Sequence, residues 1–128
     1  MDKKLQEVRF ALMTMFEVLE KDIVEMNSRK QANVYARMFY NYYLWRHKRV
    51  KHHHIKNYIK GLHHATSIYH CRLFEKEIDI YKKLRKQYIT FLYYSDQNEW
   101  EKLKIDKSFS IKDLNDIEYK KYYIDIIN

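Results

Sequence analysis

The sequence predicts an all-α fold, a single domain of roughly four to six helices over residues 1–128, with long first and fourth helices. Two observations favour this class. The chain has no proline and one glycine, Gly61, so the residues that most often end helices and shape hairpin turns are almost missing. Apolar residues recur at intervals of three and four, which is the period of an amphipathic helix. The length of 128 residues fits one hydrophobic core, and no repeat or linker divides the chain.

Residues 3–26 are predicted to form the first helix. One apolar stripe runs along it, made of Leu5, Val8, Leu12, Met15, Leu19, Ile23 and Met26. The first five of these positions also fit a heptad, so a homodimer through residues 3–26 is an alternative to packing within the domain. Packing within the domain is favoured, because Asp22 falls on the next seam position.

A second helix is predicted to begin after Asn27 and Ser28, which are good N-cap residues, and to end near His47. Its apolar and aromatic residues repeat at helical spacing. Two of them, Ala32 and Ala36, are small, and we expect them to let another helix approach closely.

A basic connector, residues 48–51, leads to a short third helix at residues 53–60, with Gly61 as its left-handed cap. The predicted buried face of this helix is formed by Ile55, Tyr58 and Ile59. The fourth helix is predicted to run from about His64 to Ser95, because the apolar pattern continues without a residue that breaks helices.

Residues 95–128 are predicted to form a C-terminal helical extension. A short helix is expected near residues 97–103, followed by a loop at residues 108–110. Ser110 and Asp113 resemble a capping box that opens a last helix. No residue pattern in this extension indicates chemistry.

Charge is concentrated in the middle of the chain. The 49 residues from Met26 to Phe74 contain ten Lys or Arg side chains and all seven histidines, but no Asp or Glu. The net charge of the whole chain is +8, so this segment carries +10 and the remaining residues −2. Because phosphates repel carboxylates, such a segment predicts an anionic partner such as nucleic acid.

This basic segment also contains the outline of a helix-turn-helix, within about residues 28–92. A short helix, a turn that contains Gly61 and a second helix with polar residues at its start follow one another there. In that motif the second helix enters the DNA major groove by its N-terminal end. Residues able to hydrogen-bond to base edges or to meet a thymine methyl group are His63, His64, Ala65, Thr66 and Ser67. Cations expected to contact the DNA backbone are Arg46, Lys48, Arg49, Lys51, Lys56, Lys60 and Arg72.

The residues around the turn resemble a known DNA-binding family. The segment reads Ile55-Lys56-Asn57-Tyr58-Ile59-Lys60-Gly61-Leu62-His63-His64-Ala65-Thr66-Ser67. It is similar to the C-terminal DNA-binding domain of the bacterial replication initiator DnaA, a helix-turn-helix of the Trp-repressor type. That family's pattern is Ile-Gly-x-x-Phe-Gly-Gly-Arg-Asp-His-(Ser or Thr)-Thr-Val. Family residues kept in this chain are Ile55, Gly61, His64 and Thr66, and Cys71-Arg72 matches a pair found just downstream in some members.

The resemblance implies that His64 and Thr66, together with His63 and Ala65, face the bases. It also implies that the DNA backbone is contacted by Arg29, Lys30 and Gln31, which resemble the basic entry to the family's long helix. The likeness spans about residues 28–92, and the chain has no counterpart of the initiator's ATPase module. It therefore implies a mode of docking, not initiator activity.

Together these features predict a sequence-specific double-stranded DNA-binding protein, either a regulator or a replication-associated protein. Scarce Gly and Pro beside abundant Lys, Ile, Tyr and Asn suggest an AT-rich genome, such as that of a phage or mobile element. The alternative is a helical protein-interaction or RNA-binding module without sequence-specific DNA recognition.

No catalytic activity, cofactor or metal is predicted. Candidate metal ligands are His52, His53, His54, His63, His64, His70 and Cys71. Their spacings match no closed zinc site, and the segment lacks the carboxylates common in metal-dependent hydrolases, so a metal-dependent nuclease is the weaker alternative. The alternative to metal binding is that these histidines are solvated and gain positive charge as the pH falls through about 6.5.

Cys71, Trp45 and Trp100 are expected to pack in the core. A single cysteine allows no internal disulfide and fits a reducing compartment. The chain also has no apolar run of the roughly 18 residues that span a bilayer and no signal peptide at its start. These features predict a cytoplasmic protein without membrane partners.

Overall fold

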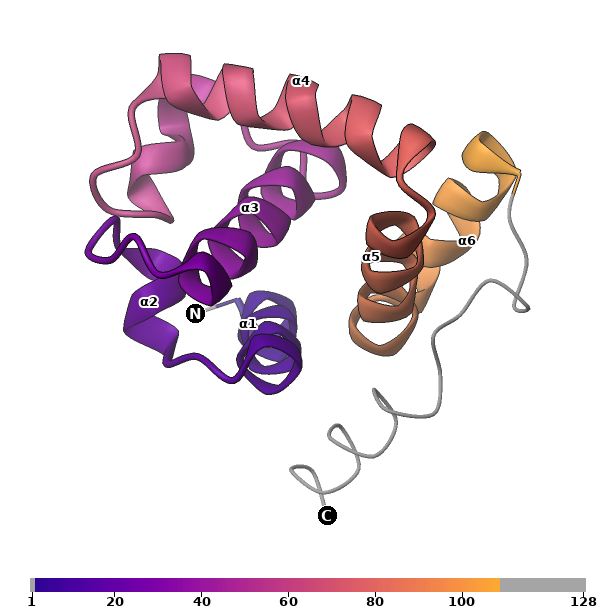
Figure 1. Ribbon diagram of the computed structural model, residues 1–128, viewed down its shortest axis with the longest axis horizontal. Helices are drawn as coiled ribbons and strands as arrows, with labels where there is room; N and C mark the ends of the chain where they lie inside the picture. The colour runs from indigo at the N-terminus through magenta and orange to yellow at the C-terminus, as the bar shows by residue number, and fades with distance from the viewer. Residues whose placement is uncertain (1, 109–128) are drawn as a thin grey trace.

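The computed structural model describes residues 2–108, whose regular structure consists of six α-helices and one 3-10 helix. The helices are α1 (Lys3–Phe16), α2 (Glu20–Val24), α3 (Gln31–Arg46), the 3-10 helix η1 (His52–Asn57), α4 (His64–Ile80), α5 (Lys82–Ser95) and α6 (Gln97–Lys107). In Figure 1, α3 runs beneath α4, with α1 and α2 below it and with α5 and α6 at the far end of α4. The predicted all-α class is confirmed.

The core is built around the ring of Phe39 on α3. This ring is fully buried and meets rings from three other helices edge-on, with centroid distances of 5.0 Å to Phe16, 5.2 Å to Phe74 and 5.9 Å to Phe91. Edge-on pairs of this kind stabilise a fold by about 0.5–1.5 kcal/mol each beyond the burial of their area. Aromatic packing thus holds α1, α4 and α5 against α3.

The predicted first helix is two helices, because the chain turns at Glu17. Glu17 has φ 54° and ψ 52°, a left-handed conformation, and its N–H donates to the carbonyl of Met13. The chain then restarts as α2, where the Asp22 carboxylate accepts from the N–H of Leu19 at 3.2 Å. The turn buries Ile23 completely and leaves Leu19 60% exposed. A continuous helix would have carried Ile23 away from the core.

The first three heptad positions of this segment pack within the domain, whereas the fifth, Leu19, is exposed. Leu5, Val8 and Leu12 are at most 5% exposed and belong to the same core as Phe39. Their side chains are therefore not free to form a seam with a second copy.

The second predicted helix begins later than expected, at Gln31. Asn27 and Ser28 lie before it, and Lys30 is its N-cap. The buried side chain of Arg37 reaches back to this loop, where its guanidinium donates to the carbonyl of Ser28. The helical ladder opens at Lys30, whose carbonyl accepts from the N–H of Val34 at 3.0 Å. The helix ends at Arg46 with His47 as its C-cap, close to the predicted end.

The third predicted helix is a 3-10 helix that begins one residue earlier than predicted and ends three residues earlier, at Asn57. Ile55 and Ile59 are fully buried as predicted, but Tyr58 points outward and is 36% exposed. Gly61 does adopt a left-handed conformation, with φ 87°, yet it lies in the turn before α4 and caps no helix. The N–H of Met26 donates to the carbonyl of Lys60 at 2.9 Å, so the turn is fixed against the α2–α3 loop.

The predicted fourth helix is also two helices, α4 and α5, separated by Tyr81. Tyr81 has φ −95° and ψ 106° and serves as the C-cap of α4 and the N-cap of α5. The break turns α5 back onto the core, where Tyr88 and Phe91 are fully buried. It also lets α6 return beside α4, since Lys107 Nζ lies 2.9 Å from Glu75 Oε1 and 3.0 Å from Asp79 Oδ1.

The short helix predicted near residues 97–103 is present as α6, extended by four residues at its end. The Asp96 side chain caps it by accepting from the N–H of Glu99 at 3.3 Å. Ser108 follows in a left-handed conformation. The rest of the predicted loop and the Ser110–Asp113 capping box lie outside the described residues. Between residues 2 and 108, no helix combines the length and the apolar character needed to cross a membrane.

Candidate nucleic-acid interface

The start of α4 exposes three consecutive side chains to solvent: His63, His64 and Ala65. His63 is the N-cap, and its Nδ1 accepts from the N–H of Ala65 at 3.2 Å. The His63 and His64 rings stack with their centroids 4.4 Å apart and an interplanar angle of 30°. Thr66, the next residue, is half-buried. Two imidazoles are therefore held as a pair at the positive end of the helix dipole.

Ser67 points inward and is fully buried, unlike the residues before it. Its hydroxyl donates to Asn41 Oδ1 at 2.9 Å and lies 2.9 Å from His52 Nδ1. Because the hydroxyl has one proton and gives it to Asn41, His52 Nδ1 is the donor in the second bond. Ser67 was predicted to contact bases, but in this conformation its side chain ties α4 to α3 and η1.

The outward face of α4 continues beyond the predicted residues. Tyr69 is 63% exposed, and Arg72 and Lys76 are exposed on the same side. With Ala65 they form a row at spacings of four, three and four. We call Ala65, Tyr69, Arg72 and Lys76 the outer row of α4. Tyr69 and Lys76 were not among the predicted contacts, although their spacing from Ala65 indicates that they lie on the same face of the helix.

Most of the cations predicted to contact the DNA backbone are exposed. We call the exposed ones that have no close ion pair among the described residues the flanking cations, which are Arg29, Lys30, Arg49, Lys51, Lys56, Lys60 and Arg72. Gln31, the first residue of α3, is exposed as well. Lys60 has a distant carboxylate neighbour, with 3.9 Å between its Nζ and Glu25 Oε1, but its side chain is 84% exposed.

Two of the predicted backbone contacts are already engaged by carboxylates. Arg46 is half-buried and pairs with Asp106 and with Glu75, whose Oε1 lies 3.2 Å away. Lys48 Nζ lies 2.9 Å from Asp2 Oδ2. The segment from Met26 to Phe74 has no acidic residues of its own. Carboxylates from other parts of the chain nevertheless pack against it and pair with two of its cations. Arg46 in particular acts as a structural cation between α3, α4 and α6.

Four of the histidines carry less positive charge at a given pH than solvated histidines would. Burial lowers the pKa of His47 to about 4, although its Nδ1 lies 3.1 Å from Glu99 Oε1. Burial also lowers the pKa values of His52 and His70, and the neighbouring charge of His54 lowers that of His53. These four rings therefore gain a proton only at a lower pH than a solvated histidine does.

Cys71, Trp45 and Trp100 pack against other side chains. Cys71 is buried, and burial raises the pKa of its thiol to about 12, so it is a neutral thiol at pH 7. Trp45 stacks on His52 with ring centroids 5.5 Å apart, and Trp100 is 3% exposed. Within residues 2–108, no three His, Cys, Asp or Glu side chains gather in a group that could hold a metal ion.

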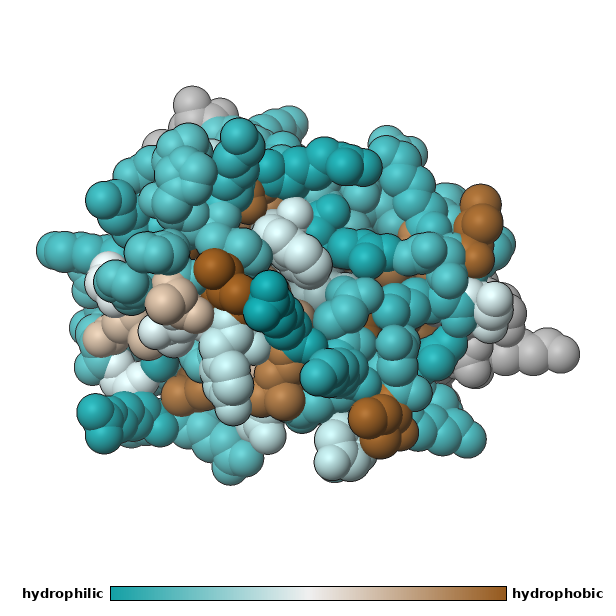
Figure 2. Space-filling model, turned by 90° about the horizontal axis from the view of Figure 1, so that it is seen from above, coloured by the Kyte–Doolittle hydropathy of each residue, from teal (hydrophilic) through white to brown (hydrophobic). Residues whose placement is uncertain are grey.

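The surface along α4 is polar. Figure 2 views the molecule from above, onto the side along which α4 runs in Figure 1. Most of this side is hydrophilic, and apolar side chains appear as separate spots rather than as one broad patch. A surface of this kind suits a hydrated partner.

Comparison with known proteins adds no relative to this description. No family model, no curated protein and no solved structure matches the chain.

Proposed function

We propose that this chain is a sequence-specific double-stranded DNA-binding protein that inserts the start of α4 into the major groove. One observation carries the proposal: His63, His64 and Ala65 are exposed at the N-terminal end of a helix, in a segment without acidic residues. Histidine can donate to or accept from base edges, and alanine fits a thymine methyl group. Thr66 is half-buried and would contact a base through its exposed part.

The flanking cations would contact the phosphates on both sides of α4. They come from the α2–α3 loop, the connector, η1, the turn and α4 itself. Contacts from several elements fix the register of a protein on the duplex, while the bases are read by a few side chains at the centre. The likeness of residues 55–67 to the DnaA domain supports the same docking mode, with Arg29, Lys30 and Gln31 on the backbone. Ser67, Arg46 and Lys48 are left out of the proposed contacts because each has a partner within the domain.

Selection of bound sequences from a random duplex pool tests the proposal most directly. We expect one enriched motif and an affinity for it that falls steeply with salt, by about −0.9 in log K against log salt for each phosphate neutralised. A pool without enrichment, or an affinity that does not change with salt, would contradict the proposal. A palindromic motif would also indicate a homodimer, since half-site symmetry mirrors protein symmetry.

A helical interaction module is the second candidate function. It is favoured by exposed apolar side chains at the α4–α5 junction, where Ile80 is 71% exposed and Tyr81 57% exposed. In that case the basic segment would meet RNA or an acidic protein. Equal binding to random duplex, RNA and heparin would favour this function, whereas preference for one duplex sequence would favour the first. Under either function we propose a cytoplasmic protein, from a phage or mobile element.

A further inference from the structure

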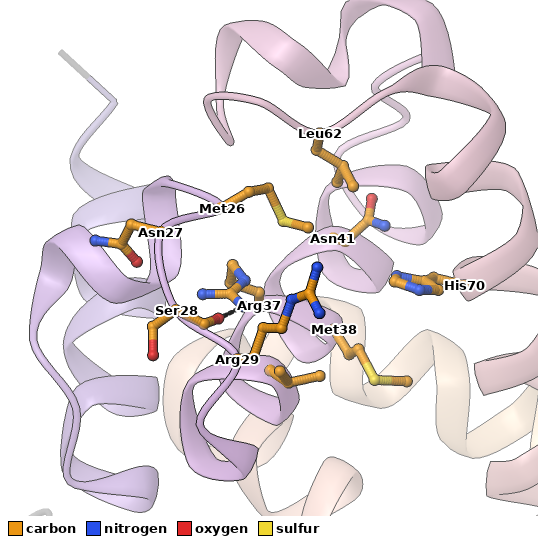
Figure 3. Close-up of a pocket in the computed structure, with 10 residues that line it drawn as sticks. Met26, Asn27, Ser28, Arg29, Arg37, Met38, Asn41, Leu62 and His70 are labelled. Atoms are coloured by element: carbon orange, nitrogen blue, oxygen red, sulfur yellow. Dashed lines mark hydrogen bonds between the residues drawn. The ribbon is translucent and has the colours of Figure 1, made fainter.

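A cavity of about 420 Å³ lies between the α2–α3 loop, α3, the turn before α4 and α4 itself. Its apolar wall is formed by Met26, Val34, Met38 and Leu62. Its polar wall includes Arg29, Arg37, Asn41 and His70, which come from the loop and from both helices (Figure 3). Among the described residues, no Asp or Glu side chain lines it. The volume falls in the range of small-molecule sites, roughly 300–1,000 Å³.

Asn41 leaves a hydrogen-bond donor unused at the inner end of this cavity. Its side chain is 1% exposed, and its Oδ1 accepts from the Ser67 hydroxyl. Its Nδ2 has no hydrogen-bond partner among the described residues. Leaving a buried donor without a partner costs about 1–3 kcal/mol, so the amide favours an acceptor placed in the cavity. Figure 3 shows this amide between Leu62 and His70.

Arg37 gives the cavity a positive charge that has the Asp22 carboxylate as an electrostatic neighbour but forms no ion pair among the described residues. Its Nη1 donates to the carbonyls of Asp22 and Glu25 at 2.9 Å and 3.3 Å, and its Nη2 donates to the carbonyl of Ser28. Burial lowers the pKa of Arg37, as expected for a charge that is partly removed from water. An anion beside this guanidinium would be stabilised.

Arg29 supplies a second and more accessible charge. Arg29 is exposed, and it takes part in none of the ion pairs found within residues 2–108. Figure 3 shows its guanidinium pointing into the space between Arg37 and His70. A guanidinium can bind a carboxylate or phosphate through two parallel hydrogen bonds.

We propose that this cavity is a binding site for a small organic anion with an apolar part. The anionic group accepts from the Arg29 guanidinium and the Asn41 amide, and the apolar part contacts Met26, Met38 and Leu62. The two arginines favour the negative charge of such a ligand, the Asn41 amide favours a hydrogen-bond acceptor, and the apolar wall favours its apolar part. The site does not depend on DNA binding. Because Leu62 and His70 belong to the turn and to α4, any effect of the ligand on DNA binding would rest on the function proposed above.

Titration of the full ¹⁵N-labelled chain with three probes tests the site by NMR. The probes are phenylacetate, the matched neutral compound phenylacetamide, and inorganic phosphate. We expect phenylacetate to cause saturable shifts of the Asn41 side-chain amide and of the His70 ring. Losing a charged hydrogen bond should make phenylacetamide about tenfold weaker, and phosphate should be weaker too because it lacks the apolar part.

Two single-charge variants locate the binding. Arg29→Gln should weaken phenylacetate about tenfold, whereas Lys30→Gln, which removes the same charge from the neighbouring exposed residue, should change the Kd less than about twofold. An equal increase in the Kd of phenylacetate in both variants would mean that the anion is attracted only by the overall positive charge. It would contradict binding in the cavity. The same conclusion would follow if phenylacetate caused no saturable shift at Asn41.

Discussion

His52 Nδ1 lies 2.9 Å from Ser67 Oγ, and this hydrogen bond joins η1 to the first turns of α4. The Ser67 hydroxyl donates a hydrogen bond to Asn41 Oδ1 on α3, so hydrogen bonds link three elements through three consecutive polar side chains. Stacking of Trp45 on His52 holds the same ring from the other side. These hydrogen bonds among His52, Ser67 and Asn41 fix the angle at which α4 leaves the turn. They therefore also fix the direction in which His64 points.

We expect Ser67→Ala to destabilise the protein by about 1–3 kcal/mol, because it leaves the buried Asn41 Oδ1 without its donor and removes a partner from the half-buried His52. Urea unfolding followed by circular dichroism measures this change. Thr66→Ala alters the neighbouring, half-buried residue and should change the free energy of unfolding by less than about 0.5 kcal/mol. Equal losses of stability in the two variants would mean that the Ser67 hydrogen bonds do not stabilise the fold more than the contacts of Thr66 do.

His64→Ala should reduce discrimination between the selected duplex and a random duplex by about 1–3 kcal/mol. Lys51→Ala should instead weaken binding to both duplexes about equally and reduce the salt slope by about 1, because an exposed lysine contacts phosphate. Fluorescence anisotropy at several salt concentrations measures both quantities. If the two variants behave alike, the assignment of α4 to the major groove is wrong.

Tyr69→Ala should weaken DNA binding without changing stability, because the ring belongs to the outer row of α4 and is 63% exposed. Tyr81→Ala is the matched control, since this ring is 57% exposed but lies at the α4–α5 junction. We expect the control to bind DNA like the unmodified chain. The reverse result would move the interface to the α4–α5 junction and favour the interaction module.

Glu17→Gly should raise the free energy of unfolding by about 1 kcal/mol, because a left-handed conformation costs less for glycine than for other residues. Thermal and urea unfolding measure the gain. Glu20→Gly places the same change in the first turn of α2, where it should destabilise by up to about 1 kcal/mol. A loss of stability in Glu17→Gly would contradict the described break between α1 and α2.

Stability should fall as the pH drops from about 6.5 to about 4. The pKa of His47 is about 4 in the folded chain because of burial, below the ordinary value near 6.5 that applies when the chain is unfolded. Over this interval the unfolded state binds a proton and the folded state does not, so the contribution of His47 is full above the upper value. It should be lost progressively below that value, by about 3 kcal/mol at most.

Urea unfolding at several pH values measures this loss. His47→Asn keeps a donor that can reach Glu99 but removes the titration, so it should flatten this part of the profile. An unchanged profile in the variant would show that other groups cause the pH dependence.

The helical class and the order of segments around the turn were predictable, whereas the ends and breaks of the long helices were not. Ile78, Tyr88 and Leu92 keep helical spacing across Tyr81, so the pattern is the same for one straight helix and for two that fold back. Burial of Tyr88 and Phe91 against Phe39 and the ion pairs of Lys107 with α4 favour the folded-back arrangement. Such contacts join residues far apart in sequence and leave no local signal.

The candidate site shows the same division. His63, His64 and Ala65 were predicted at the start of a helix, and they are exposed there, because polar residues after a turn seldom have apolar neighbours to cover them. The inward direction of Ser67 could not be predicted, since it depends on Asn41 and His52 being brought to it.

The sequence by itself determined the all-α class, through its lack of proline and its single glycine, and the concentration of positive charge between Met26 and Phe74. Only the tertiary structure decided which of those charges remain available. Arg37 is buried among backbone carbonyls, Arg46 is held by Glu75 and Asp106, and Arg29 lies beside a cavity without an ion pair to any described residue. The physical reason is that helix propensity and charge belong to residues, whereas solvation and pairing depend on which surfaces the fold brings together.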